Sequence, residues 1–213
     1  MKFSQYIPLA ARTCKSLPPL EHANHMGLGI VGEVGEIIDA LKKHHIYGKP
    51  LDRANLVEEL GDVCWYVANL VAMFPEPDDT DCLMELPVEK LGGIDVRNNP
   101  TVTILVASQV AATLSINFYE AVAGMVSAGD GGDTTHSGKS THKFNVAKCM
   151  AMEHAAQLCL LTAEIAYLID VPLEEAFEVN IKKLAQRYGD KYSDFNAINR
   201  DLTAERKILE EGA

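Results

Sequence analysis

The sequence predicts an all-α protein, a helical bundle built around one hydrophobic core. Apolar residues recur three or four positions apart through most of the chain, which is the spacing of one buried helix face. The stripes are clearest within residues 30–41 and 56–74. A chain of 213 residues can bury such a core, and we expect residues 1–213 to form a single domain.

The apolar period and the helix-breaking residues together predict where the helices begin and end. Asp52 is expected to cap a helix, because Gly48 and Pro50 interrupt the chain just before it. Pro172 suits a first helical turn, and Gly189 suits a helix end. The expected helices are Phe3–Cys14, Leu20–His45, Arg53–Phe74, Val102–Val126, Asn145–Ile169, Pro172–Tyr188 and Leu202–Glu210.

Two stretches rich in Pro, Gly and Asp are predicted to be loops, Pro75–Pro100 and Gly129–Thr141. The second contains Gly-Lys-Ser, but the position five residues before Gly138 is Asp133, where a phosphate-binding P-loop requires glycine. We therefore interpret this stretch as an ordinary loop. The β-branched run Thr101–Val106 leaves open a short strand in place of the start of a helix.

Composition limits the partners and the compartment. The net charge of −11 argues against binding to nucleic acid or to anionic membranes. Residues Met1–Lys15 are too polar for a signal peptide, and the apolar run Thr101–Val126 is interrupted by Gln109, Asn117 and Glu120. The five cysteines form no C-x-x-C pair, as expected of reduced thiols. We expect a cytoplasmic protein with neither a nucleic-acid nor a membrane partner.

Two acidic motifs occupy consecutive predicted helices, Glu33-Val-Gly-Glu36 and Glu59-Leu-Gly-Asp62. Residues three apart share a helix face, and on a helical wheel Glu59 and Asp62 flank the core stripe with Tyr66 between them. The neighbouring Glu58 falls near the opposite pole and is expected to be solvated. Four facing carboxylates repel one another unless cations lie between them, and hard divalent cations prefer oxygen ligands. The pattern therefore predicts a Mg²⁺ site.

A polar flank on a later helix carries Asn180, Lys183 and Arg187. An amide, an ammonium and a guanidinium aligned in this way suit phosphate oxygens. The second helix contains Gly29, Gly32 and Gly35, each of which costs roughly 1 kcal/mol relative to alanine. Three such residues in one helix predict the close approach of another helix or of a ligand.

These motifs resemble those of the MazG-like, all-α nucleoside triphosphate pyrophosphohydrolases, which carry E-x-x-E on one helix and E-x-x-D on the next. The resemblance covers about residues 1–74 and 155–211, including Asn180-Ile-Lys-Lys-Leu-Ala-Gln-Arg-Tyr188 and Ala197-Ile-Asn-Arg-Asp201. Residues 75–154 depart from the family and are interpreted as an insertion with one extra helix and its loops. We expect this insertion to act as a lid over the pocket or as a subunit interface, and not to be without a function.

The resemblance implies a cofactor and two sets of site residues. The first set would hold Mg²⁺, or Mn²⁺ in its place, and consists of Glu33, Glu36, Glu59 and Asp62. The second set would bind substrate and consists of Lys43, Tyr66, Asn180, Lys183 and Arg187. Catalysis is assigned to Glu36, as the general base, and to Glu59, Lys183 and Arg187. His25 and Trp65 are interpreted as packing residues.

The implied reaction is hydrolysis of a ribo- or deoxyribonucleoside triphosphate to the monophosphate and pyrophosphate, in a homodimer or larger homo-oligomer. Two alternatives remain, a dUTPase/dCTPase-type or phosphoribosyl-ATP pyrophosphatase of the same superfamily, and a catalytically silent helical interaction protein. A di-metal redox bundle is disfavoured, because its Glu-x-x-His pairs do not occur in the sequence.

Overall fold

The computed structural model describes residues 1–74, 100–129 and 137–212, and these residues form helices joined by short connections. The all-α prediction is confirmed, since no strand occurs within the described ranges. The helices are α1 (Phe3–Arg12), α2 (Pro19–His45), α3 (Arg53–Val71), α4 (Pro100–Gly129), α5 (Ser137–Leu168), α6 (Leu173–Tyr188), α7 (Asp194–Ile198) and α8 (Leu202–Glu211).

Three sequence predictions need correction. The alternative of a strand at Thr101–Val106 is wrong, because these residues lie within α4. The predicted loop Gly129–Thr141 is too long, because Gly129 ends α4 and α5 begins at Ser137. Helix α7 was not predicted, since five residues are too few to show an apolar period. Of the predicted loop Pro75–Pro100, all but Pro100 lies outside the described residues.

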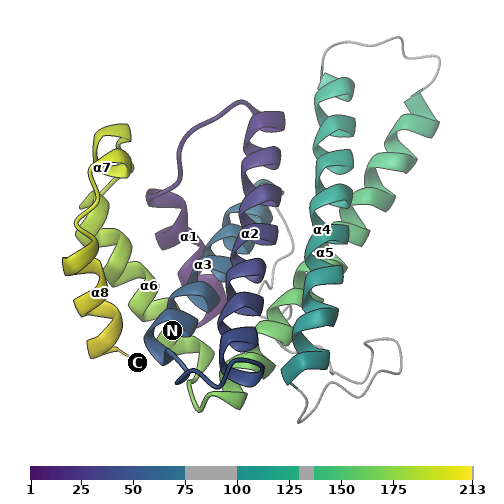
Figure 1. Cartoon of the computed structure of the whole chain (residues 1–213). Helices are drawn as coiled ribbons and strands as arrows, with labels where there is room; N and C mark the ends of the chain where they lie inside the picture. The colour runs from purple at the N-terminus through teal and green to yellow at the C-terminus, as the bar shows by residue number, and fades with distance from the viewer. Residues whose placement is uncertain (75–99, 130–136, 213) are drawn as a thin grey trace.

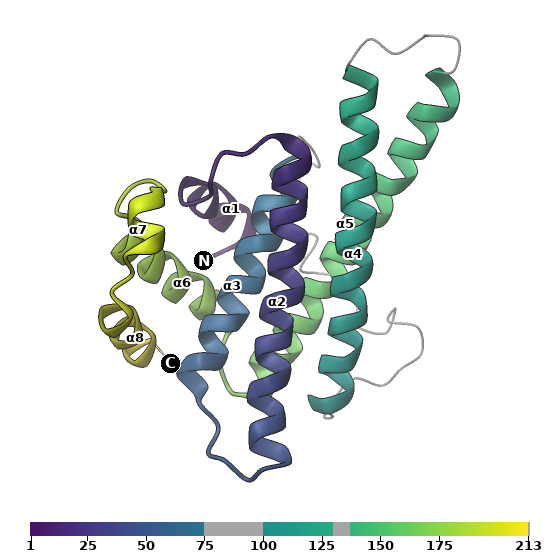
Figure 2. The same ribbon diagram turned by 45° about the horizontal axis from the view of Figure 1, so that its top comes forward.

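Helix α3 lies at the centre of the bundle and packs against α1, α2, α5, α6 and α8. In Figure 1 the long α4 and α5 stand together on one side of α2, and α6, α7 and α8 lie on the other side of α3. The turned view in Figure 2 keeps α2 between α3 and α4. The bundle therefore divides into a long α4–α5 hairpin and a compact group of helices around α3.

The central position of α3 follows from its sequence, which is apolar on more than one face. Between Leu56 and Val71 nearly every side chain is buried, including Leu60, Val67 and Leu70 at 0% exposure. Burying each such side chain contributes roughly 1.5–3 kcal/mol to the free energy of unfolding, so α3 contributes strongly to the stability of the core. Any polar residue on α3 must therefore face a neighbouring helix or a pocket.

Helix α4 is the most apolar element of the described chain. Its stretch Val102–Ser127 is long and apolar enough to cross a membrane by length and composition alone. In the structure it packs between α2 and α5, and less than half of its most apolar stretch, 44%, is buried. At its contact with α2, Ser115 Oγ donates to the Gly27 carbonyl over 3.1 Å. The insertion predicted at 75–154 would end inside α5, which continues unbroken to Leu168.

The start of α3 gives a stability prediction. The Asp52 carboxylate accepts a hydrogen bond from the Asn55 backbone N–H over 3.0 Å. It also accepts hydrogen bonds from the two terminal nitrogens of Arg206, over 3.0 and 3.1 Å. We expect Asp52→Ala to lower the free energy of unfolding by about 1–2 kcal/mol, because a helix cap and an ion pair are both lost. Asp52→Asn should lose less than about 1 kcal/mol, since asparagine caps equally well. Urea unfolding of both variants measures the difference, and equal losses would contradict the cap.

Candidate functional site

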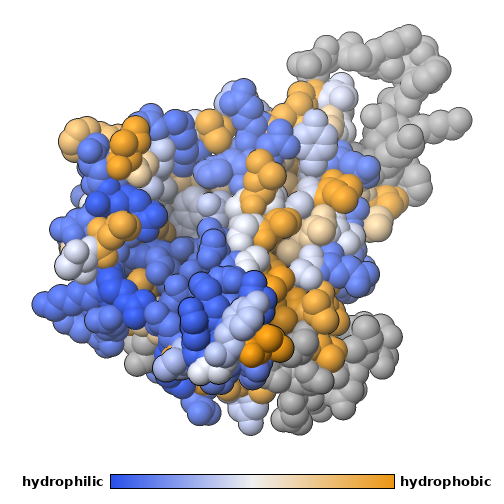
Figure 3. Space-filling model, in the orientation of Figure 1, coloured by the Kyte–Doolittle hydropathy of each residue, from blue (hydrophilic) through white to orange (hydrophobic). Residues whose placement is uncertain are grey.

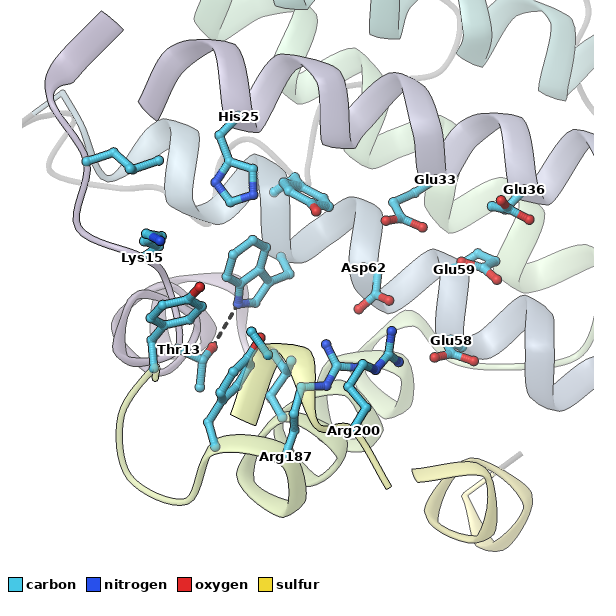
Figure 4. Close-up of a pocket in the computed structure, with 17 residues that line it drawn as sticks. Thr13, Lys15, His25, Glu33, Glu36, Glu58, Glu59, Asp62, Arg187 and Arg200 are labelled. Atoms are coloured by element: carbon cyan, nitrogen blue, oxygen red, sulfur yellow. Dashed lines mark hydrogen bonds between the residues drawn. The ribbon is translucent and has the colours of Figure 1, made fainter. Parts of the chain in front are cut away.

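A pocket of about 620 Å³ lies between α2 and α3 on one side and α6 with the segments around α7 on the other (Figure 4). Its walls differ in chemistry. Carboxylates come from α2 and α3, cationic side chains come from the opposite side, and aromatic rings close one end. The lining residues are Thr13, Lys15, Leu17, His25, Glu33, Glu36, Glu58, Glu59, Asp62, Trp65, Tyr66, Leu184, Arg187, Tyr188, Tyr192, Ala197 and Arg200.

The acidic wall contains a tight cluster formed by Glu33, Glu59 and Asp62. One carboxylate oxygen from each lies within 4.8 Å of the others. Glu59 and Asp62 are three residues apart on α3, and the apolar stripe of α2 packs into the same core, which turns Glu33 toward them. Glu36 lines the pocket from an exposed position, one turn along α2. In Figure 4 these four side chains lie along the same two helices.

Burial and mutual repulsion change the proton affinity of this cluster. Burial raises the pKa of Glu59, and the neighbouring Glu33 and Asp62 raise it further. Burial likewise raises the pKa of Glu33, and the charge of Asp62 adds to the effect. Both shifts favour protonated carboxyls when no cation is present, whereas a bound cation favours the charged forms. Three converging carboxylates fit a hard divalent cation, which takes oxygen ligands.

Two side chains of α6 hold the carboxylate of Asp62 in place by hydrogen bonds. Asn180 Nδ2 donates to Asp62 Oδ1 and Lys183 Nζ donates to Asp62 Oδ2, each over 2.6 Å. The Tyr6 hydroxyl donates to Asn180 Oδ1 over 2.8 Å, which orients the amide. Helix α6 can come this close because residue 61 is glycine, where an added Cβ would lie 2.9 Å from the Cβ of Asn180. The carboxylate is therefore held rigidly at the edge of the pocket.

The five predicted substrate-binding residues do not all lie in the pocket. Tyr66 and Arg187 line the pocket. Asn180 and Lys183 are 2% and 0% exposed, so their polar atoms face the carboxylates of α3 from beneath rather than the open pocket. Lys43 is exposed, pairs with Asp39 over 2.6 Å, and does not line the pocket.

The expectation that Glu58 is solvated and apart from the site is wrong. Glu58 lines the pocket, and its Oε1 accepts from Lys183 Nζ over 3.2 Å. The helical wheel predicts the pole opposite the core stripe for Glu58, but Lys183 of α6 reaches it there. Glu58 is therefore partly buried between α6 and the pocket, and is not a fully solvated surface residue.

The cationic side of the pocket includes two residues that the sequence did not single out, Arg200 and Lys15. Arg200 and Arg187 both donate to the buried carboxylate of Glu205. Lys15 Nζ lies 2.5 Å from Asp194 Oδ1, in front of the Tyr192 ring. Both new residues lie in connections between helices, where no period marks a face. The only available signal for Arg200 was its place in the motif Ala197-Ile-Asn-Arg-Asp201.

Aromatic side chains close the end of the pocket near α1. The Trp65 indole is 8% exposed and donates from Nε1 to the Ala10 carbonyl and to Thr13 Oγ1. Its ring meets Tyr66 edge to face with centroids 4.9 Å apart, and His25 meets Tyr66 in the same way at 5.8 Å. Trp65 and His25 therefore pack as expected, and both also line the pocket.

The position of Tyr66 depends on Gly29, which gives a second prediction. A Cβ at residue 29 would lie 2.2 Å from Tyr66 Cε1, whereas a Cβ at Gly32 would meet nothing within 4 Å. We expect Gly29→Ala to displace the Tyr66 ring and to lower the free energy of unfolding by about 1–3 kcal/mol. Gly32→Ala is the matched control and should stabilise α2 by roughly 0.5–1 kcal/mol. Thermal unfolding of both variants tests this, and a stabilised Gly29→Ala protein would contradict the contact.

Comparison with known protein families finds a similarity over part of the chain. Residues 22–82 match the family model described as the MazG nucleotide pyrophosphohydrolase domain. This segment contains Glu33, Glu36, Glu59 and Asp62, but neither the α6 residues nor Arg200. No curated protein and no solved structure matches the chain.

Proposed function

We propose that the protein hydrolyses ribo- or deoxyribonucleoside triphosphates to the monophosphate and pyrophosphate with the help of Mg²⁺. The match of residues 22–82 to the MazG nucleotide pyrophosphohydrolase domain supports this reaction class. One observation carries the proposal. An acidic cluster suited to a divalent cation faces Arg187 and Arg200 across a single pocket. A substrate that brings both a cation and several phosphate charges satisfies both walls at once.

Glu33, Glu59 and Asp62 would hold Mg²⁺, with Glu36 next to them, and Mn²⁺ would fit the same oxygen ligands. When bound, the cation neutralises phosphate charge and lowers the pKa of water. Glu36 lies outside the three-carboxylate cluster and is exposed to the pocket, so we assign it the role of taking the proton from the attacking water.

The remaining residues of the chain bind and orient. Arg187 would stabilise negative charge on the phosphates, and Tyr66 would bound the space for sugar and base. Lys183 and Asn180 act indirectly in this scheme, by fixing the carboxylate of Asp62. Lys43 would need to leave Asp39 to reach a phosphate, so we give it no role in the reaction.

One assay panel tests the reaction. Purified protein is incubated with each nucleoside triphosphate and deoxynucleoside triphosphate in Mg²⁺ or Mn²⁺, and pyrophosphate and orthophosphate are measured separately. We expect pyrophosphate in a one-to-one ratio with the monophosphate. Release of orthophosphate alone would overturn the proposal, and turnover restricted to dUTP, dCTP or phosphoribosyl-ATP would assign one of the narrower activities. No turnover of any nucleotide would favour a silent helical interaction protein.

The assignment of Glu36 as the general base is tested by substitution, with a carboxylate outside the pocket as the control. Glu36→Gln should lower kcat more than KM, because it removes a base and leaves the three clustered carboxylates in place. Glu174→Gln, an exposed carboxylate in the first turn of α6, should leave both constants unchanged. Full activity of the Glu36→Gln protein would contradict the assignment of the base.

We also propose that the protein forms a homo-oligomer in the cytoplasm through the α2–α4 face. Figure 3 shows hydrophobic side chains gathered in a band over these helices. Leu28 and Val31 of α2 and Leu105 and Ile116 of α4 are 46–77% exposed, and such apolar faces commonly mark interfaces. No described residue of α4 or α5 lines the pocket, which favours an interface role for this hairpin over a lid. Light scattering of wild type and Ile116→Lys measures the mass, and a monomeric wild type would contradict the proposal.

A further inference from the structure

We propose that Glu205 is a positioning residue that holds Arg187 and Arg200 together as a clamp for the phosphate chain, and that Arg200 is a substrate-binding residue. The inference rests on the proposed function and adds two residues to its site. Both lie beyond α6, in a part of the chain that the matched family segment does not reach.

The geometry joins three elements through one carboxylate. Arg187 of α6 donates from Nε to Glu205 Oε1 over 2.9 Å and from Nη2 to Oε2 over 2.6 Å. Arg200, in the connection between α7 and α8, donates from Nη2 to the same Oε2 over 2.6 Å. Arg200 also donates from Nε to Oε1, over 3.5 Å. The two oxygens of one carboxylate on α8 thus set the separation of the two guanidinium groups.

Glu205 is placed to act through the arginines and not on the substrate. It is 2% exposed and does not line the pocket, whereas Arg187 and Arg200 both do. Burial alone raises the pKa of Glu205, but the hydrogen bonds from Arg187 and Arg200 outweigh burial and hold the pKa at about 2. The carboxylate therefore stays ionised and counters the repulsion between the two guanidinium groups.

Each guanidinium keeps donors for a second anion. Arginine has five N–H donors in a planar fork, and the Nε–Nη2 edge that faces Glu205 uses two of them. Arg187 also shares a hydrogen bond with Tyr188. The donors that remain on each guanidinium suit a phosphate. In Figure 4 the two arginines lie beside one another, across the pocket from Asp62 and Glu58. Phosphates reaching out from a cation at the acidic cluster would meet this pair. Because Glu205 holds both arginine side chains in place before the substrate binds, they need not be ordered at that step, which favours binding of the phosphates.

A purely structural reading is that Glu205 only fastens α8 to the bundle. The chain offers a matched control for this reading on the same helix. Arg206 fastens α8 to α3 through its two-nitrogen contact with Asp52 and does not line the pocket. Loss of that pair weakens the attachment of α8 and leaves the arginine clamp in place.

The experiment compares Glu205→Gln, Arg200→Gln and Arg206→Gln in the full-length protein with Mg²⁺. KM and kcat are measured for the best nucleotide, together with the inhibition constant of inorganic pyrophosphate. We expect Arg200→Gln to raise KM and the inhibition constant about 10- to 100-fold, the effect of losing charge-assisted hydrogen bonds. Glu205→Gln should raise both about 10-fold, and the double variant should lose less than the product of the two.

Several results would overturn the clamp. Unchanged or tighter pyrophosphate binding by Glu205→Gln would show that the carboxylate does not position the arginines for phosphate. Equal losses in Arg206→Gln would show that the attachment of α8 is the whole effect. If wild type hydrolyses no nucleotide, the proposed function fails separately. Calorimetric binding of Mg²⁺-pyrophosphate to wild type and to Arg200→Gln then decides on the clamp, and equal affinities would reject it.

Discussion

Asp62→Asn is expected to lower kcat/KM for nucleoside triphosphate hydrolysis by about 100-fold or more, since removing even a residue that only orients a metal ligand costs about 10- to 100-fold. The substitution removes one of the three clustered carboxylates. It also conflicts with α6, because both oxygens of Asp62 accept hydrogen bonds, one from Asn180 and one from Lys183. An asparagine has one acceptor oxygen, so its amide would face a donor.

Steady-state kinetics and calorimetric titration with Mn²⁺ measure the two consequences separately. Asp190→Asn is the matched control, because its side chain is fully exposed and does not line the pocket. This control should keep its kcat/KM and its affinity for Mn²⁺. An Asp62→Asn protein with full activity and unchanged Mn²⁺ affinity would refute the metal assignment.

Lys183→Met should lower the free energy of unfolding by about 3–5 kcal/mol, the usual effect of removing one partner from a buried ion pair. Lys183 is 0% exposed and is the counter-charge of both Asp62 and Glu58. Without the ammonium, these two carboxylates repel each other beside the cluster. A divalent cation offsets part of that repulsion, so added Mg²⁺ should stabilise Lys183→Met more than it stabilises wild type.

Urea unfolding with and without Mg²⁺ tests this second expectation. Lys182→Met changes the neighbouring, exposed lysine of α6 and should stay within about 0.5 kcal/mol of wild type. A Lys183→Met protein as stable as Lys182→Met, but with a raised KM, would instead mean that Lys183 contacts the phosphates directly.

Helix positions could be predicted from the sequence because the apolar period is a local property. The ends of α2, α3 and α6 fall within a few residues of expectation. The Asp52 cap was also expected, and its side chain does accept from Asn55. The start of α5 could not be found, since Ser137–Thr141 is rich in residues that are common in loops.

The site was predictable only where its residues lie on a regular helix beside a core stripe. Glu33, Glu59 and Asp62 meet as their spacing indicated. A helical wheel gives the direction of a side chain but not which neighbouring helix covers it, and for this reason Lys183 and Glu58 were misplaced. Arg200 lies in a connection without a period, and only the fold brings it next to Arg187.

The contacts that complete the site close long loops of chain, and this bears on how the protein tolerates changes in length. Lys183 and Asp62 are 121 positions apart, and Tyr6 and Asn180 are 174 apart. The entropy of closing a flexible loop grows only with the logarithm of its length, so each doubling costs roughly 0.6 kcal/mol. One charge-assisted hydrogen bond contributes more, about 1.5–3 kcal/mol. A connection between two helices of the bundle can therefore change in length at little cost while the two halves of the pocket still meet.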